Sequence, residues 1–123
     1  MKLLIVDDSA TMRKIIMRGI RQSGFKVDEF LEAGNGKEAL QIISSNSGID
    51  IVLTDINMPE MNGLELLEAL RSSAETKDIP VIMITTEGSE AVIEKAKQLG
   101  VNGFIRKPFT PEALGSTLSS VVR

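Results

Sequence analysis

The chain has 123 residues, of which 42% are hydrophobic and 25% are charged, and this is the length and composition of one soluble globular domain. It contains no cysteine and no histidine, which excludes disulfide bonds and argues against zinc, haem and imidazole chemistry. A net charge of −3 argues against a nucleic-acid partner, for which a basic surface is expected.

Short apolar runs recur along the chain and predict the strands of a sheet. The first, Leu3–Val6, is continuous, as expected of a strand that is buried on both faces. Val27–Ala33 is weaker and more polar, and we interpret it as an edge strand. Three further runs follow: Ile49–Leu53, Pro80–Ile84 and Gly103–Ile105.

Between these runs, apolar residues recur at helical spacing and predict five helices. The positions that mark them are, in chain order, Met12, Ile15, Ile16, Gly19 and Ile20; Ala39, Leu40 and Ile43; Gly63, Leu66, Leu67 and Leu70; Val92, Ala96 and Leu99; Leu114, Leu118 and Val121. Ser9 lies near the start of the first helix and Gly24 just past its end. Thr110 and Pro111 have the cap and first-turn positions of the fifth.

Strands that alternate with helices predict a doubly wound α/β fold, in which helices cover both faces of a five-stranded parallel sheet. In such a sheet, ligands bind beyond the carboxyl ends of the strands. The side chains at those ends are therefore the candidate functional residues.

The longest unbroken apolar runs, Leu3–Val6 and Val81–Ile84, fall far short of the ~20 residues that a spanning helix needs. The start of the chain enters the first run at once and lacks a signal-peptide cleavage region. We therefore expect a cytoplasmic protein without membrane insertion, in which residues 1–123 form a single domain.

Charged and polar residues follow four of the predicted strands. Asp7 and Asp8 follow the first, Asp55 the third, Thr85 the fourth, and Lys107 comes shortly after the fifth. Three close carboxylates repel each other, and a hard divalent cation such as Mg²⁺ removes the conflict because it prefers oxygen ligands. An ammonium and a hydroxyl can hold phosphoryl oxygens. One carboxylate can be the nucleophile that forms an acyl phosphate.

Each of these residues alone also has an ordinary explanation. Asp8 could cap the first helix, with Asp7 in the turn before it. Asp55 could start a turn, Thr85 could be an ordinary strand-end residue, and Lys107 could be a solvated charge. Their joint position at one edge of a sheet favours a site.

Four motifs contain these residues: Val6-Asp7-Asp8-Ser9, Thr54–Pro59 with Asn62-Gly63, Ile84-Thr85, and Lys107-Pro108-Phe109. In this order and spacing they resemble the receiver domain of the two-component response regulators, and the resemblance covers essentially the whole chain. The run Ser9–Lys14 most resembles the stand-alone chemotaxis receivers of the CheY type. The resemblance implies the strand order 2-1-3-4-5.

The resemblance also implies roles for the site residues. Asp55 would accept a phosphoryl group from a phosphohistidine of a partner histidine kinase, because this chain has no histidine of its own. Asp8 and Asp55 would hold Mg²⁺ directly, together with the backbone carbonyl of Asn57. Asp7 would act from the inner or the outer metal shell. Lys107 would pair with the phosphoryl oxygens, and its peptide bond to the following proline would be cis.

Thr85 and Phe104 would form the switch. Thr85 would hydrogen-bond the phosphate and Phe104 would turn inward behind it, although from the sequence alone Phe104 would be a core residue. The chain departs from the family pattern at Thr86, where a small residue is usual and a β-branched side chain could crowd the phosphoryl group. Asn57 and Glu87 would flank the site.

The output would be binding to a downstream protein, such as the flagellar switch, and the chain would catalyse only its own phosphorylation and dephosphorylation. The expected face is made by the fourth helix, the fifth strand and the fifth helix, with Ile93, Lys95, Lys97 and Arg106 as its exposed members. Ile93 is equally well explained as a peripheral core residue.

Three alternatives stay open at this stage. The chain could be a phosphorelay intermediate that passes the phosphoryl group to a histidine phosphotransfer protein, or a receiver fragment of a longer regulator. It could also be an enzyme of another class. An aspartate-nucleophile phosphatase would need a second aspartate where this chain has Asn57, and a flavin carrier would need aromatic stackers, whereas Trp and Tyr are absent.

Overall fold

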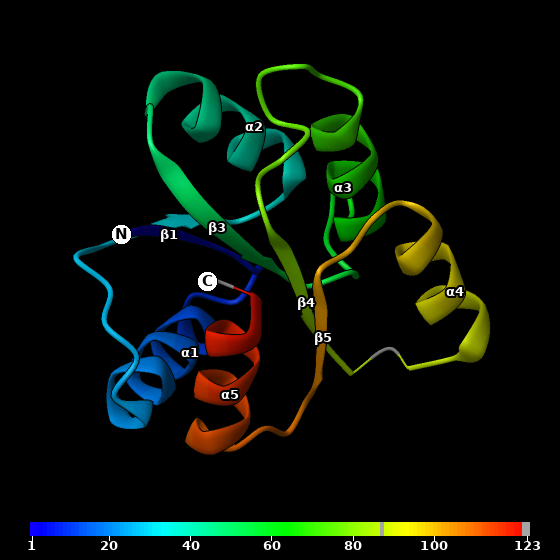
Figure 1. Cartoon of the computed structure of the whole chain (residues 1–123). Helices are drawn as coiled ribbons and strands as arrows, with labels where there is room; N and C mark the ends of the chain where they lie inside the picture. The colour runs from blue at the N-terminus through cyan, green and yellow to red at the C-terminus, as the bar shows by residue number, and fades with distance from the viewer. Residues whose placement is uncertain (87, 122–123) are drawn as a thin grey trace.

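Within residues 1–86 and 88–121, which the computed structural model describes, five strands and five helices alternate along the chain (Figure 1). The strands are β1 Lys2–Val6, β2 Glu29–Ala33, β3 Ile49–Thr54, β4 Val81–Thr85 and β5 Gly103–Arg106. The helices are α1 Ala10–Ser23, α2 Gly36–Ser45, α3 Gly63–Arg71, α4 Glu90–Gln98 and α5 Pro111–Val121.

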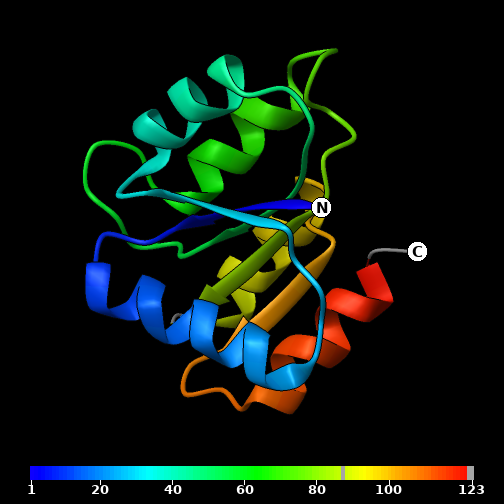
Figure 2. The ribbon, with the colours of Figure 1, turned by 90° about the vertical axis from the view of Figure 1, so that its left-hand side faces the viewer.

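The strands form one parallel sheet in the order β2-β1-β3-β4-β5. Helices α1 and α5 pack on one face of the sheet, and α2, α3 and α4 pack on the other (Figure 2). This is the predicted doubly wound α/β fold, and the predicted strand order 2-1-3-4-5 is confirmed.

The central strand β1 is buried on both faces, as its continuous apolar run predicts. Successive side chains of a strand point to opposite faces. Leu3 and Ile5 accordingly pack with α1 and α5, whereas Leu4 and Val6 pack with α2 and α3. All four are at most 1% exposed, so β1 forms part of two separate hydrophobic clusters.

Strand β2 lies at the edge of the sheet, as its polar composition predicts. It begins at Glu29 rather than at Val27, where the apolar pattern placed its start. Val27 packs against the cluster under α1 and α5 before the chain enters the sheet. The strand therefore begins only where its backbone pairs with Lys2 of β1.

The helix ends follow the predicted caps. The Ser9 hydroxyl accepts a hydrogen bond from the third backbone N–H of α1, and Gly24 ends this helix at φ 85°. The Thr110 hydroxyl accepts a backbone N–H of α5, whose first residue is Pro111. Because Ser9 caps α1, the carboxylate of Asp8 is not used for that purpose.

The helices are amphipathic, with one apolar face turned to the sheet. In α1 the buried face is made by Ile16, Gly19 and Ile20. Ile15, which the apolar pattern placed with them, is 44% exposed, because one residue further along a helix turns the side chain by about 100°. In the described part of the chain, no helix combines the length and the apolar character that crossing a bilayer requires.

The loop between β3 and α3 folds back on the end of β3. The Gly63 N–H donates to the Ile56 carbonyl across 2.8 Å, and Glu60 adopts a left-handed backbone conformation with φ 67°. A Cβ atom at position 63 would lie 2.1 Å from the carbonyl oxygen of Asp55. The close approach of α3 to the end of β3 therefore requires glycine.

We expect Gly63→Ala to lower the free energy of unfolding by about 1–3 kcal/mol, because its methyl group would overlap backbone atoms that cannot rotate away. Gly34→Ala is the matched control, since a Cβ there would first meet Glu38 at 3.7 Å. Urea denaturation of both variants measures the difference. Equal stability of the two variants would contradict the steric explanation.

Candidate functional site

Three carboxylates meet at the carboxyl edge of the sheet. Asp7 and Asp8 follow β1, and Asp55 follows β3. Each contributes one oxygen, and these oxygens all lie within 4.8 Å of one another. Asp7 is buried, Asp55 is half-buried and Asp8 is exposed. The set offers only hard oxygen donors, which is the donor chemistry that a divalent metal ion such as Mg²⁺ or Ca²⁺ uses.

The ammonium of Lys107 lies between two of these carboxylates. Its Nζ atom is 2.9 Å from Asp7 Oδ2 and 3.1 Å from Asp55 Oδ2, and the Lys107 side chain is only 11% exposed. The backbone N–H of Lys107 donates to the Thr85 carbonyl, 3.0 Å away. The Lys107–Pro108 peptide bond is cis, as predicted.

Burial acts to lower the pKa of Lys107, but the hydrogen bond and charge of Asp7 and those of Asp55 act in the opposite direction. The net effect is a pKa above the ordinary value for lysine. The ammonium is therefore charged at neutral pH, and it neutralises part of the negative charge of the cluster.

Backbone groups hold the remaining side-chain oxygens of Asp7 and Asp55. The Ser9 N–H donates to Asp7 Oδ1 across 2.9 Å, and the Ile56 N–H donates to Asp55 Oδ1 across 2.7 Å. The backbone of Asp55 itself is tied to β1, because its N–H donates to the Val6 carbonyl across 2.9 Å. Each of these two carboxylates therefore has one oxygen bound to a backbone N–H and the other bound to Lys107.

The other predicted residues surround this cluster. Thr85 is completely buried at the end of β4. Phe104 of β5 is partly buried and packs against the cluster under α2, α3 and α4. Asn57 and Thr86 are exposed. Glu87 lies outside the residues that the structure describes.

The predicted partner face is made by α4, β5 and α5. Lys95, Lys97 and Arg106 are exposed, whereas Ile93 is only partly exposed. The guanidinium of Arg106 lies directly over Gly88, where a Cβ atom would come within 2.3 Å of Arg106 Cζ. Arg106 therefore covers the backbone at the start of the loop that leads into α4.

Arg13 is a contact of the site that the sequence did not point to. Its Nη1 atom donates to the backbone carbonyl of Asp7 across 2.6 Å. Its Nε atom pairs with Glu32 at 2.9 Å. In the sequence, Arg13 is one of several basic residues of the first helix, and only the three-dimensional structure distinguishes it.

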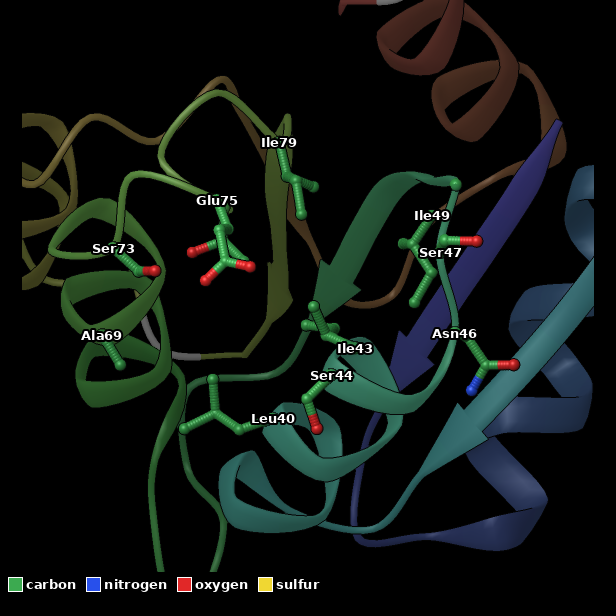
Figure 3. Close-up of a pocket in the computed structure, with 12 residues that line it drawn as sticks. Leu40, Ile43, Ser44, Asn46, Ser47, Ile49, Ala69, Ser73, Glu75 and Ile79 are labelled. Carbon is green, nitrogen blue, oxygen red and sulfur yellow. The ribbon is translucent and has the colours of Figure 1, made fainter.

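A separate groove of about 570 Å³ lies between α2 and α3 (Figure 3). Its floor is apolar and includes Leu40, Ile43 and Ile79, and Glu75 is its charged residue. Ile49 and Ile79 lie near the amino ends of β3 and β4. The groove is therefore at the opposite end of the sheet from the carboxylates.

The family model described as the response regulator receiver domain matches residues 3–119. Two curated chemotaxis proteins are similar over nearly their whole length. CheY1 of Helicobacter pylori is 48% identical over 122 residues, which are 99% of this chain and 97% of that protein. A CheY homolog of Campylobacter jejuni is 47% identical over 99% of this chain and 92% of its own length.

Two solved structures share the fold. Chemotaxis protein CheY4 of Vibrio cholerae superposes with a TM-score of 0.85 at 36% identity, and the match covers 98% of this chain and 97% of that one. CheY in the CheX-CheY-BeF3-Mg complex of Borrelia burgdorferi superposes with a TM-score of 0.86 at 31% identity, over 98% of this chain and 87% of that one.

The raised pKa of Lys107 predicts a loss of stability at alkaline pH. The contribution of the ion pair is fully present below 10.5, the ordinary pKa of lysine, and it is lost as the pH rises through the higher pKa of the folded state. The free energy of unfolding of the wild type should therefore fall toward that of Lys107→Met above this pH, whereas between about pH 7 and about pH 10 the gap should stay constant.

Urea denaturation in the presence of a metal chelator, repeated across this pH range, measures that gap. Lys77→Met is the control, since Lys77 is exposed and has no ion pair within the described residues. If both variants gave the same gap at every pH, the ion pair of Lys107 would not be the cause.

Proposed function

The chain belongs to the response regulator receiver domain family, and from this premise we propose that it is a signalling switch controlled by phosphorylation of Asp55. The observation that carries the proposal is the position of Lys107, whose ammonium bridges Asp7 and Asp55 at 2.9 and 3.1 Å. A half-buried carboxylate with a cation beside it and two further carboxylates within 4.8 Å is a suitable phosphoryl acceptor.

The phosphoryl group would come from a phosphohistidine of a partner histidine kinase, because the chain contains no histidine. In this step the bond between phosphorus and the imidazole nitrogen breaks, and a bond between phosphorus and a carboxylate oxygen of Asp55 forms. Lys107 would hold oxygens of the transferred group through charge-assisted hydrogen bonds. The chain would act only on its own Asp55, in phosphorylation and in dephosphorylation, and on no other substrate.

We assign the metal site to Asp7, Asp8 and Asp55, with the backbone carbonyl of Asn57, and the proposed cofactor is Mg²⁺. The donor set fits, because three carboxylate oxygens within 4.8 Å repel one another and the single charge of Lys107 neutralises only part of their negative charge. When bound, Mg²⁺ supplies charge neutralisation and places for phosphoryl oxygens.

The proposed output is binding to a downstream protein through the face of α4, β5 and α5. Thr85 is buried at the end of β4, and its neighbour in the sheet is Arg106 of β5. Phe104 lies two residues before Arg106 on the same strand. A change at Thr85 can thus reach Arg106 through the neighbouring strand. The guanidinium of Arg106 lies over Gly88, just before α4, and this helix carries the exposed Lys95 and Lys97, with Ile93 at the margin of the face.

The similar proteins are named as chemotaxis proteins and are matched over nearly their whole length. This favours a role as a stand-alone chemotaxis switch over a role as a phosphorelay intermediate. The flagellar switch is the corresponding target. A CheX partner, as named for the Borrelia complex, is a second kind of protein that such a surface can meet.

Intact mass after incubation with acetyl phosphate and Mg²⁺ tests the acceptor. We expect the wild type to gain one phosphoryl group in a metal-dependent reaction and Asp55→Asn to gain none. Asp50→Asn is the matched control, because it removes a carboxylate from the same strand on its exposed side. A folded, Mg²⁺-binding wild type that gained no mass would overturn the proposal.

Thr85→Ala tests the switch separately from the chemistry. We expect this variant to gain the phosphoryl group but to lose most of the change in backbone amide chemical shifts that phosphorylation causes in α4 and β5, because the hydroxyl that links them to the phosphoryl group is missing. Thr86→Ala, one residue on and exposed, is the control and should keep the shift changes. Undiminished shift changes in Thr85→Ala would exclude Thr85 as the link.

A further inference from the structure

Arg13 connects the turn that contains Asp7 and Asp8 to β2, the edge strand of the sheet. It lies in the first turns of α1, and its side chain extends back over the end of β1, where Nη1 donates to the Asp7 carbonyl across 2.6 Å. Its Nε atom pairs with Glu32 Oε1 of β2 at 2.9 Å. The Arg13 side chain is 18% exposed and that of Glu32 is 42% exposed.

We propose that Arg13 is a positioning residue for the metal site, and that its hold on the Asp7 carbonyl keeps the Asp8 carboxylate within reach of Asp55. The inference rests on the proposed function, because it concerns the affinity of that site for Mg²⁺. It adds Arg13 and Glu32 to the residues that determine this affinity.

The three carboxylates are not fixed to the same degree. Asp7 is held by the Ser9 N–H and by Lys107, and Asp55 is held by the Ile56 N–H and by Lys107. Asp8 is exposed, and among the described residues it has no hydrogen bond or ion pair that would orient its side chain. Its position depends on the backbone that carries it.

That backbone is the peptide unit between Asp7 and Asp8. The carbonyl of Asp7 and the N–H of Asp8 belong to one planar group, so a hydrogen bond to the carbonyl also fixes the plane from which the Asp8 side chain departs. The N–H of Asp7 is tied to Ala33 of β2 across 3.0 Å. Arg13 supplies the second restraint, on the other side of the same residue.

Glu32 keeps the guanidinium in the orientation that this contact needs. It takes the Nε–H on one side of the planar group, and Nη1 then points to the Asp7 carbonyl. The pairing also keeps the guanidinium from turning to the exposed carboxylate of Asp8, for which it would otherwise compete with the metal ion.

A purely electrostatic role of Arg13 would have the opposite sign. A cation close to three carboxylates disfavours a divalent ion, so loss of its charge alone would tighten Mg²⁺ binding. Loss of positioning would weaken the binding instead. A role in fold stability alone would lower the melting temperature and leave the affinity unchanged. One titration therefore distinguishes the three roles.

The experiment is calorimetric titration of the unphosphorylated full chain with MgCl₂, together with its melting temperature. We expect Arg13→Met to raise the Mg²⁺ dissociation constant by about 10-fold, which is the lower end of the effect of removing a residue that supports metal ligands. Arg18→Met is the matched control, since Arg18 is an exposed arginine of the same helix, and it should leave the constant unchanged. Arg13→Lys should restore part of the affinity, because one ammonium can reach the carbonyl but cannot bridge to Glu32 in the same way.

A dissociation constant in Arg13→Met that was unchanged or lower would overturn the proposal, whatever its melting temperature. If Arg13→Met did not fold, Glu32→Gln and Glu32→Ala would decide: glutamine keeps an oxygen for Nε and should keep the affinity, whereas alanine should lose it. Equal affinities of these two would count against the proposal. A wild type without Mg²⁺ binding would overturn the metal site of the proposed function, which is a result distinct from a failure of Arg13.

Discussion

The ion pair of Lys107 with Asp7 and Asp55 is the interaction on which the rest of the site depends. Asp7 has a side chain that is 3% exposed, and a carboxylate so deeply buried is stable only with a cation and further hydrogen bonds. Lys107 supplies the cation from a position 100 residues further along the chain. In the described residues, no buried side-chain nitrogen or oxygen is left without a partner. The buried oxygens of the cluster therefore already have partners, and a phosphoryl group at Asp55 must take over a contact that Lys107 already makes.

Such a meeting of distant residues follows from the parallel sheet. β1 and β3 are neighbours and end at the same edge, so Asp7 and Asp55 lie side by side without any dedicated loop. β5 is separated from β1 by two strands, and Lys107, which follows β5, extends its side chain back to the carboxylates that follow β1 and β3. The loop from Asp55 to Gly63 returns so closely to the end of β3 that a single methyl group would not fit. The backbone of the sheet and of this loop thus determines where the charges stand, and the side chains provide the chemistry.

The sequence predicted those parts of the molecule that depend on local patterns. The apolar runs such as Leu3–Val6 and the cap residues such as Ser9 act within a few residues, and the rule that parallel strands expose their carboxyl ends at one edge then placed Asp7, Asp55 and Lys107 together. It did not predict the contacts of Arg13, because the chain brings β2 next to α1 only in three dimensions. The exposure of Ile15 and the later start of β2 were missed for a related reason: apolar character shows that a residue can be buried, but its neighbours in space decide whether it is.

The layers of the fold differ in how firmly they are packed, and this difference bears on signalling. Helix α3 buries Leu66, Leu67 and Leu70 against the sheet, whereas α4 buries only Ala96 among its residues. Val92 of α4 is only partly buried against the same cluster, so a shift of this helix costs less apolar contact than a shift of α3, whose three buried leucines are worth several kcal/mol. The proposed output surface therefore includes α4, a helix whose displacement loses little apolar contact. It also includes β5, which ends at Arg106, directly before Lys107 of the ion pair. A rigid site and an easily displaced face on the same sheet are what a switch requires, because a small change in charge at Asp55 can then alter the face without disturbing the core.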